Sequence, residues 1–97
     1  MRILHVITTL DVGGAEMHLL AQVAGQVRRG HEVRVAWLKG KGSLAGDLRA
    51  AGASWVGQVA PRPRGVAELG SQMRWAERVH SHLLKADLAS ALMATLA

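Results

Sequence analysis

The chain has 97 residues, of which 49% are hydrophobic and 20% are charged, so its composition fits one small globular domain and excludes a disordered segment. The 12 lysines and arginines outnumber the 7 acidic residues, and the formal charge of +5 favours an acidic partner such as a nucleotide phosphate, an anionic lipid surface or nucleic acid. The absence of cysteine excludes a disulfide framework and thiolate metal ligands.

The first ten residues do not have the pattern of a signal peptide, because their apolar run is interrupted by His5 and no small-residue cleavage pattern follows. No apolar run in the sequence approaches the roughly 18 uncharged residues that a membrane span requires. We therefore expect a cytoplasmic protein. The basic surface leaves open a peripheral contact with the inner face of an anionic membrane.

Residues 1–38 predict one βαβ unit. Residues 3–7 are a short apolar run with β-branched side chains, which is typical of a strand covered on both faces. The residues that follow place apolar side chains on one helical stripe, which predicts a surface helix with one buried face. Gly30 fits the left-handed position after that helix, and a second strand begins at Glu32. The short connection favours a right-handed parallel crossover.

The remainder of the chain continues the alternation of helix and strand. Ser43 is a candidate cap for the next helix, Gly57 weakens the next strand, and two prolines at residues 61–65 predict a loop. The predicted elements are a helix at 44–51, a strand at 53–59, a helix at 66–76, a very short strand at 78–81 and a helix at 85–96. This order predicts an α/β fold, a partial Rossmann-like doubly wound parallel sheet of about four strands with flanking helices. An open sheet of this kind usually has further units, so we expect a truncated chain.

Two adjacent glycines, Gly13 and Gly14, stand at the predicted turn from the first strand into the first helix. Without side chains they let a ligand approach the backbone, and the amides and dipole of the helix start favour a diphosphate. The alternative is that the pair only forms a tight turn. Glu16, in the first helical turn, is either a carboxylate favoured by the helix dipole or a hydrogen-bond acceptor for a sugar or acceptor hydroxyl.

Several function classes are disfavoured by missing motifs. A nicotinamide-dinucleotide fold would show Gly-x-Gly-x-x-Gly at this turn and an acidic residue after the second strand, but Lys39 and Lys41 follow that strand here. The lysine-serine pair of a phosphate-binding P-loop is missing as well, so a kinase or NTPase is disfavoured and no cofactor is expected. Basic and aromatic residues do not interleave, which disfavours nucleic acid.

His80 and His82 lie at the expected carboxyl end of the fourth strand, where open α/β sheets bind ligands. Residues two apart on a strand share a face, so the pair suggests zinc, but no third ligand is evident in the sequence and no metal is expected. His82, nearer the loop, is the candidate to hydrogen-bond a polar ligand or to exchange a proton. We interpret His80 as a core histidine with satisfied hydrogen bonds, and we assign His5 no role.

Four motifs occur in a characteristic order and spacing over nearly the whole chain, and together they resemble the amino-terminal domain of the retaining glycosyltransferases of family 4. They are Ile-Leu-His-Val-Ile at 3–7, Gly-Gly-Ala-Glu at 13–16, Gly-His-Glu-Val at 30–33 and Val-His-Ser-His-Leu-Leu-Lys-Ala-Asp at 79–87. The chain departs from the family at Glu77-Arg78, where an aspartate commonly precedes the strand.

The resemblance implies a GT-B enzyme of two Rossmann-like domains that moves a sugar from a nucleotide diphosphate sugar to an acceptor hydroxyl with retention, normally without a metal. It implies that residues 1–97 are the incomplete, acceptor-side amino-terminal domain, without the carboxy-terminal donor domain and inactive alone. Gly13 and Gly14 would lie near the donor diphosphate, and His82 near the reacting sugar or acceptor as the candidate catalytic residue. The alternative is a non-catalytic basic α/β module that binds a phosphorylated ligand, an anionic membrane or nucleic acid.

Overall fold

The computed structural model describes residues 1–11, 13–60 and 62–82. Strands and helices alternate in this part of the chain, in the order β1 (Arg2–Ile7), α1 (Gly14–Arg28), β2 (Glu32–Trp37), α2 (Ala45–Ala50), β3 (Trp55–Gln58), α3 (Pro63–Trp75) and β4 (Arg78–His82). The helix predicted at 85–96 lies outside the described residues. Within them, no helix is both long and apolar enough to cross a lipid bilayer.

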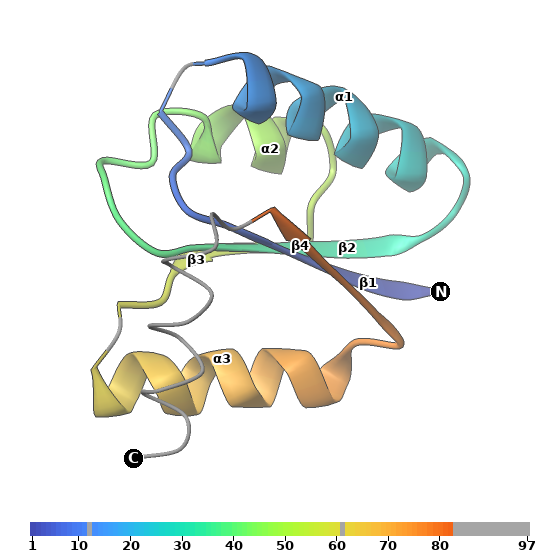
Figure 1. The fold of residues 1–97 in the computed structure, drawn as a ribbon. Helices are drawn as coiled ribbons and strands as arrows, with labels where there is room; N and C mark the ends of the chain where they lie inside the picture. The colour runs from blue at the N-terminus through green and yellow to red at the C-terminus, as the bar shows by residue number, and fades with distance from the viewer. Residues whose placement is uncertain (12, 61, 83–97) are drawn as a thin grey trace.

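The four strands form one parallel sheet in the order β3-β2-β1-β4. The chain moves outward from β1 through β2 to β3, and then returns through α3 to place β4 on the other side of β1. Helices α1 and α2 cover one face of the sheet and α3 covers the other (Figure 1). The predicted fold class, a partial Rossmann-like doubly wound parallel sheet with flanking helices, is therefore confirmed. The reversal of strand order places a topological switch point between β1 and β4.

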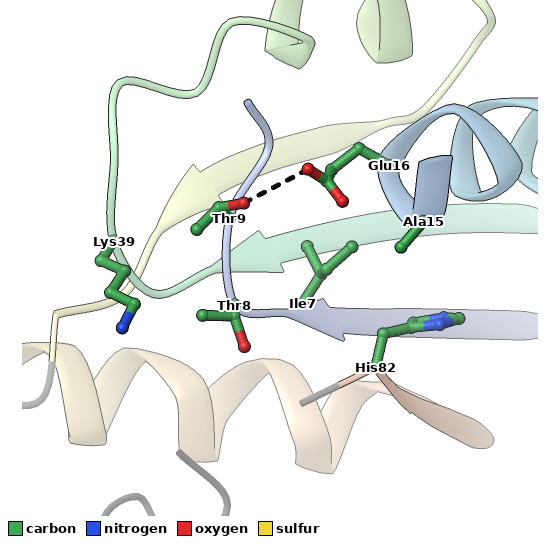
Figure 2. Close-up of a pocket in the computed structure, with 7 residues that line it drawn as sticks. All are labelled: Ile7, Thr8, Thr9, Ala15, Glu16, Lys39 and His82. Carbon is green, nitrogen blue, oxygen red and sulfur yellow. Dashed lines mark hydrogen bonds between the residues drawn. The ribbon is translucent and has the colours of Figure 1, made fainter. Parts of the chain in front are cut away.

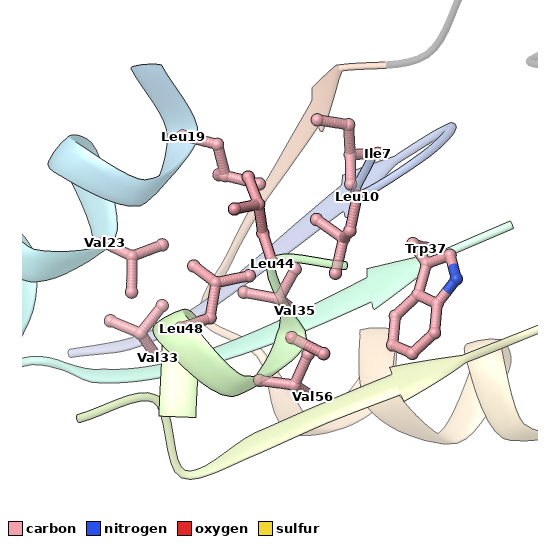
Figure 3. Close-up of a cluster of buried hydrophobic side chains, with 11 residues drawn as sticks. Ile7, Leu10, Leu19, Val23, Val33, Val35, Trp37, Leu44, Leu48 and Val56 are labelled. Atoms are coloured by element: carbon pink, nitrogen blue, oxygen red, sulfur yellow. The ribbon is translucent and has the colours of Figure 1, made fainter. Parts of the chain in front are cut away.

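Alternation along β1 divides its side chains between two cores. Ile7 belongs to the larger core beneath α1 and α2 (Figure 3), whereas Leu4 and Val6 belong to a smaller core on the α3 side, against which Leu69 packs. This division is what a strand covered on both faces requires. The buried members of the larger core are Ile7, Leu10, Leu19, Val23, Val33, Val35, Trp37, Leu44, Ala45, Leu48 and Val56.

Gly30 has a φ of +89°, so the predicted left-handed position after α1 is confirmed. Two other local predictions were wrong. Helix α3 begins at Pro63 rather than at Val66, because the first turn of a helix does not need the N–H that proline lacks. Ser43 does not cap α2; Leu44 is the capping residue, and no side chain makes a capping hydrogen bond there.

Strand β3 continues through Gly57, because the glycine makes room for the indole ring of Trp55. A Cβ at position 57 would overlap that ring, which lies on the same side of the strand two residues earlier. Gly57, which made the strand prediction weaker, is therefore required by the packing of the Trp55 ring.

Arg34 connects the sheet to α3. Its guanidinium carbon lies 3.8 Å from the centroid of the Trp75 ring, and its Nη1 donates a hydrogen bond of 3.0 Å to Gln72 Oε1. Gln72 is buried in α3 and donates in turn to Glu68 at 2.9 Å. These contacts, a cation–π interaction and two hydrogen bonds, fix the helix that delivers the chain to β4.

Gly65→Ala should destabilise the protein, because a Cβ at this position in α3 would overlap the backbone carbonyl oxygen of Ala60. We expect the free energy of unfolding to fall by about 1–3 kcal/mol in urea denaturation. The matched control is Gly46→Ala in α2, where no atom lies within 4 Å of an added Cβ. This control should stabilise the protein by roughly 0.5–1 kcal/mol. Equal effects of the two substitutions would contradict the close approach of Gly65 to Ala60.

Candidate functional site

A cavity of about 300 Å³ lies where β1 and β4 end, beside the first turn of α1. Ile7 and His82 are paired in the parallel register, so both strands deliver their last residue to the same edge of the sheet. This edge is the switch point, the place where open α/β sheets bind ligands. The cavity, which we call the switch-point pocket, is lined by Ile7, Thr8, Thr9, Ala15, Glu16, Lys39 and His82 (Figure 2).

The polar side chains of the switch-point pocket come from four segments. Thr8 and Thr9 follow β1, Glu16 belongs to α1, Lys39 follows β2 and His82 ends β4. Thr9 Oγ1 donates to Glu16 Oε2 at 3.5 Å, at the outer limit of a hydrogen bond (Figure 2). The lining therefore offers hydroxyls, a carboxylate, an ammonium group and an imidazole, a set suited to a small ligand that carries hydroxyl groups and negative charge.

Gly13 and Gly14 begin α1 beside the switch-point pocket, but they do not belong to its lining. Gly13 is the N-cap residue with an extended φ of −171°, and neither glycine has a positive φ. A Cβ on Gly13 would come within 2.9 Å of Glu16 Oε2, whereas a Cβ on Gly14 would meet no atom within 4 Å. Gly13 thus leaves room for the Glu16 carboxylate, and the structure brings Glu16 and His82, but not the glycine pair, to the pocket wall.

Three histidines meet between the sheet and α1. His5 and His80 are paired across β1 and β4, and His82 follows on the same face of β4. His5 Nδ1 lies 3.1 Å from His82 Nε2, and the ring centroids of His5 lie 5.3 Å from those of His80 and His82. His5 is fully buried. His80, which we interpreted as a core residue, is half-buried, because β4 is an edge strand of the described sheet.

Two glutamines on α1 contact this histidine cluster. Gln26 Oε1 lies 2.7 Å from His5 Nε2, and one turn earlier Gln22 Nε2 lies 3.4 Å from His80 Nδ1. An amide oxygen only accepts hydrogen bonds, so His5 Nε2 carries the proton and donates, which leaves a lone pair on His5 Nδ1. His82 Nε2 then donates to that lone pair. The other ring nitrogen of His82 is consequently a hydrogen-bond acceptor.

Burial keeps His5 and His82 uncharged at neutral pH. It lowers the pKa of His5 from 6.5 to about 4, an effect that the hydrogen bond with Gln26 opposes and the nearby His82 and His80 reinforce. Burial also lowers the pKa of His82, with additional repulsion from His80 and His18. His82 therefore meets a pocket ligand as a neutral imidazole that can accept a proton.

Comparison of the chain with protein-family models, with curated proteins and with solved structures gave no match. The class of site is therefore defined by its residues and by its place in the fold. It is a polar ligand pocket at the switch point of a parallel α/β sheet, and the neutral histidine in its wall, His82, also belongs to a partly buried cluster of three histidines.

The free energy of unfolding should fall as the pH is lowered from 6.5 to about 4 in metal-free buffer. In that range the unfolded chain binds a proton at His5 that the folded chain does not, so each step down in pH favours unfolding. The lowered pKa of His82 acts in the same direction. Urea denaturation at several pH values should show a shallower pH dependence for His5→Gln, which removes one titrating group. An unchanged dependence in this variant would contradict the assignment to His5.

Proposed function

We propose that this chain forms the acceptor side of a retaining glycosyltransferase of the GT-B type, similar to family 4, which moves a sugar from a nucleotide diphosphate sugar to an acceptor hydroxyl. The supporting observation is that Glu16 and His82, selected from opposite ends of the described chain, line one pocket at the switch point of the sheet. Three of the four motifs that resemble the family contribute to this edge, through β1, the start of α1 and the part of the fourth motif that forms β4 up to His82. The motif at 30–33 lies at the amino end of β2, at the opposite edge of the sheet.

The chemistry of the switch-point pocket fits a sugar or a hydroxyl-bearing acceptor. The Glu16 carboxylate and the threonine hydroxyls can bind sugar hydroxyls, and the Lys39 side chain supplies positive charge for a diphosphate. Glycosyl transfer breaks the bond between the anomeric carbon and the diphosphate oxygen and forms a bond from that carbon to the acceptor oxygen. The acceptor hydroxyl loses its proton, and the departing nucleotide diphosphate can take it up. In this proposal neutral His82 accepts a hydrogen bond from the reacting sugar or acceptor hydroxyl and orients it.

Transfer requires the donor and the acceptor to be held together in one geometry, and one wall of a cleft holds only one side of that arrangement. We therefore expect residues 1–97 to bind a ligand without turning it over. A longer chain that contains both GT-B domains would carry out the transfer. Robust sugar transfer by the 97 residues alone would contradict the proposal that they form only the acceptor side of the cleft.

Glu16→Ala and His82→Ala should each weaken the binding of nucleotide diphosphate sugars or simple glycosides about tenfold, because each removes a polar group from the pocket wall. Chemical-shift mapping by NMR with the labelled 97-residue chain measures both the affinity and the location. Glu68→Ala is the control, since Glu68 lies on α3 at the opposite face of the sheet. Salt-sensitive binding of duplex DNA or anionic vesicles, with no response to nucleotides or glycosides, would instead support the non-catalytic basic module.

Gly13→Ala should weaken the same binding more than Gly14→Ala. The added methyl group at position 13 displaces the Glu16 carboxylate, whereas position 14 faces open space. The extended φ of Gly13 accommodates alanine and an added Cβ at Gly14 meets no atom within 4 Å, so both variants should keep the fold, which circular dichroism verifies. Titration of the two variants under identical conditions tests this order. Equal losses of affinity would contradict the role of Glu16 and would favour direct contact between the ligand and the glycine backbone.

A further inference from the structure

The histidine cluster has the composition and spacing of a metal site. His5, His80 and His82 each offer one ring nitrogen, and these nitrogens lie within 4.8 Å of one another. In tetrahedral zinc sites with Zn–N bonds of about 2.0–2.1 Å, two histidine nitrogens stand about 3.3 Å apart. His5 Nδ1 and His82 Nε2 are already 3.1 Å apart. Only His80, half-buried on an edge strand, has to turn its ring inward to complete the set.

The glutamines of α1 supply the outer contacts that zinc-binding histidines usually have. A ligating histidine donates its other ring N–H to a fixed acceptor, which holds the ring and leaves the ligating nitrogen with its lone pair. Gln26 Oε1 does this for His5 at 2.7 Å. The Gln22 amide stands 3.4 Å from His80 Nδ1, and a half-turn of the amide presents its oxygen to that nitrogen. His80 Nε2 then becomes the ligand.

We propose that His5, His80 and His82 bind one divalent transition-metal ion of the zinc class. Imidazole nitrogens suit zinc and its neighbours, whereas magnesium and calcium require oxygen ligands. Three protein ligands leave the fourth tetrahedral position open to water or to another donor. This site goes beyond the proposed sugar transfer, and zinc binding can be measured without any sugar ligand. The two sites share only His82, because the metal would bind to the face of β1 and β4 under α1.

The sequence did not indicate this site because its third ligand lies at the opposite end of the described chain. His80 and His82 form a recognisable pair, but His5 joins them only through the parallel pairing of β1 with β4. Its burial also matters, because a fully buried histidine with one nitrogen already donating presents its remaining nitrogen in a fixed direction. The geometry is therefore partly organised before a metal binds.

Titration of the 97-residue chain with zinc chloride at pH 7.5, in competition with a chromogenic chelator, should show one ion bound per chain. Cobalt(II) in place of zinc should give the intense visible absorption of a tetrahedral nitrogen site, and magnesium should not compete. His80→Ala and His82→Ala should each weaken zinc binding at least about 100-fold. Gln26→Ala should weaken it about 10- to 100-fold, the usual effect of losing an outer contact.

The control is His31→Ala, which removes a histidine in the turn before β2 and should leave zinc affinity unchanged. Circular dichroism of every variant verifies that the fold is retained, and the fully buried His5 is left intact for this reason. Absence of zinc binding by the parent chain, or unchanged affinity in both His80→Ala and His82→Ala, would overturn the proposal. Loss of binding in His18→Ala but not in His80→Ala would overturn the assigned ligand set.

Discussion

The parallel pairing of β1 with β4 is the constraint on which the site depends. It places His80 beside His5 and His82 beside Ile7, so one strand pair forms both the histidine cluster and one wall of the switch-point pocket. A shift of one residue would turn His80 and His82 to the α3 face and remove both features together. The contacts of Arg34 with Trp75 and Gln72 hold α3 on that opposite face, and α3 sets where β4 begins.

Local pattern was sufficient to predict the fold class and the order of helices and strands in residues 1–82. Short apolar runs became strands, one apolar stripe became α1, and Gly30 took the left-handed conformation that ends it. The errors also have local causes that a pattern does not contain. Pro63 opens α3 because a first helical turn tolerates proline, and Leu44 rather than Ser43 occupies the capping position of α2.

The candidate site was predictable only in part, because it combines distant segments. Glu16 and His82 could be selected for their positions at a helix start and at a strand end, and both line the switch-point pocket. His5 could not be selected, since nothing near it in the sequence indicates its partners. Gly13 was predicted to let a ligand approach its backbone. In the structure, the absence of a side chain at Gly13 leaves room for the carboxylate of Glu16. That relation depends on a side-chain conformation that spacing alone does not define.

Helix α1 links the two features by its periodicity. Its first turn carries Glu16 into the switch-point pocket, Leu19 and Val23 enter the larger core, and Gln22 and Gln26 reach the histidines one turn apart. Residues spaced three or four apart share a helical face, so a single rigid segment sets the geometry of the core, of the pocket and of the cluster.

Through its contact with His5, His82 can present either a hydrogen-bond acceptor or a hydrogen-bond donor to the pocket. A neutral imidazole has one proton, so the state of one ring nitrogen fixes the state of the other. When His82 donates through Nε2 to His5, its Nδ1 is an acceptor. If a cation binds to Nε2, the proton is on Nδ1, and Nδ1 becomes a donor. Because such coupling is reciprocal, a pocket ligand that requires an acceptor would oppose the cation, and one that requires a donor would recruit it. The exchange needs a proton to relocate across one ring and no movement of the backbone.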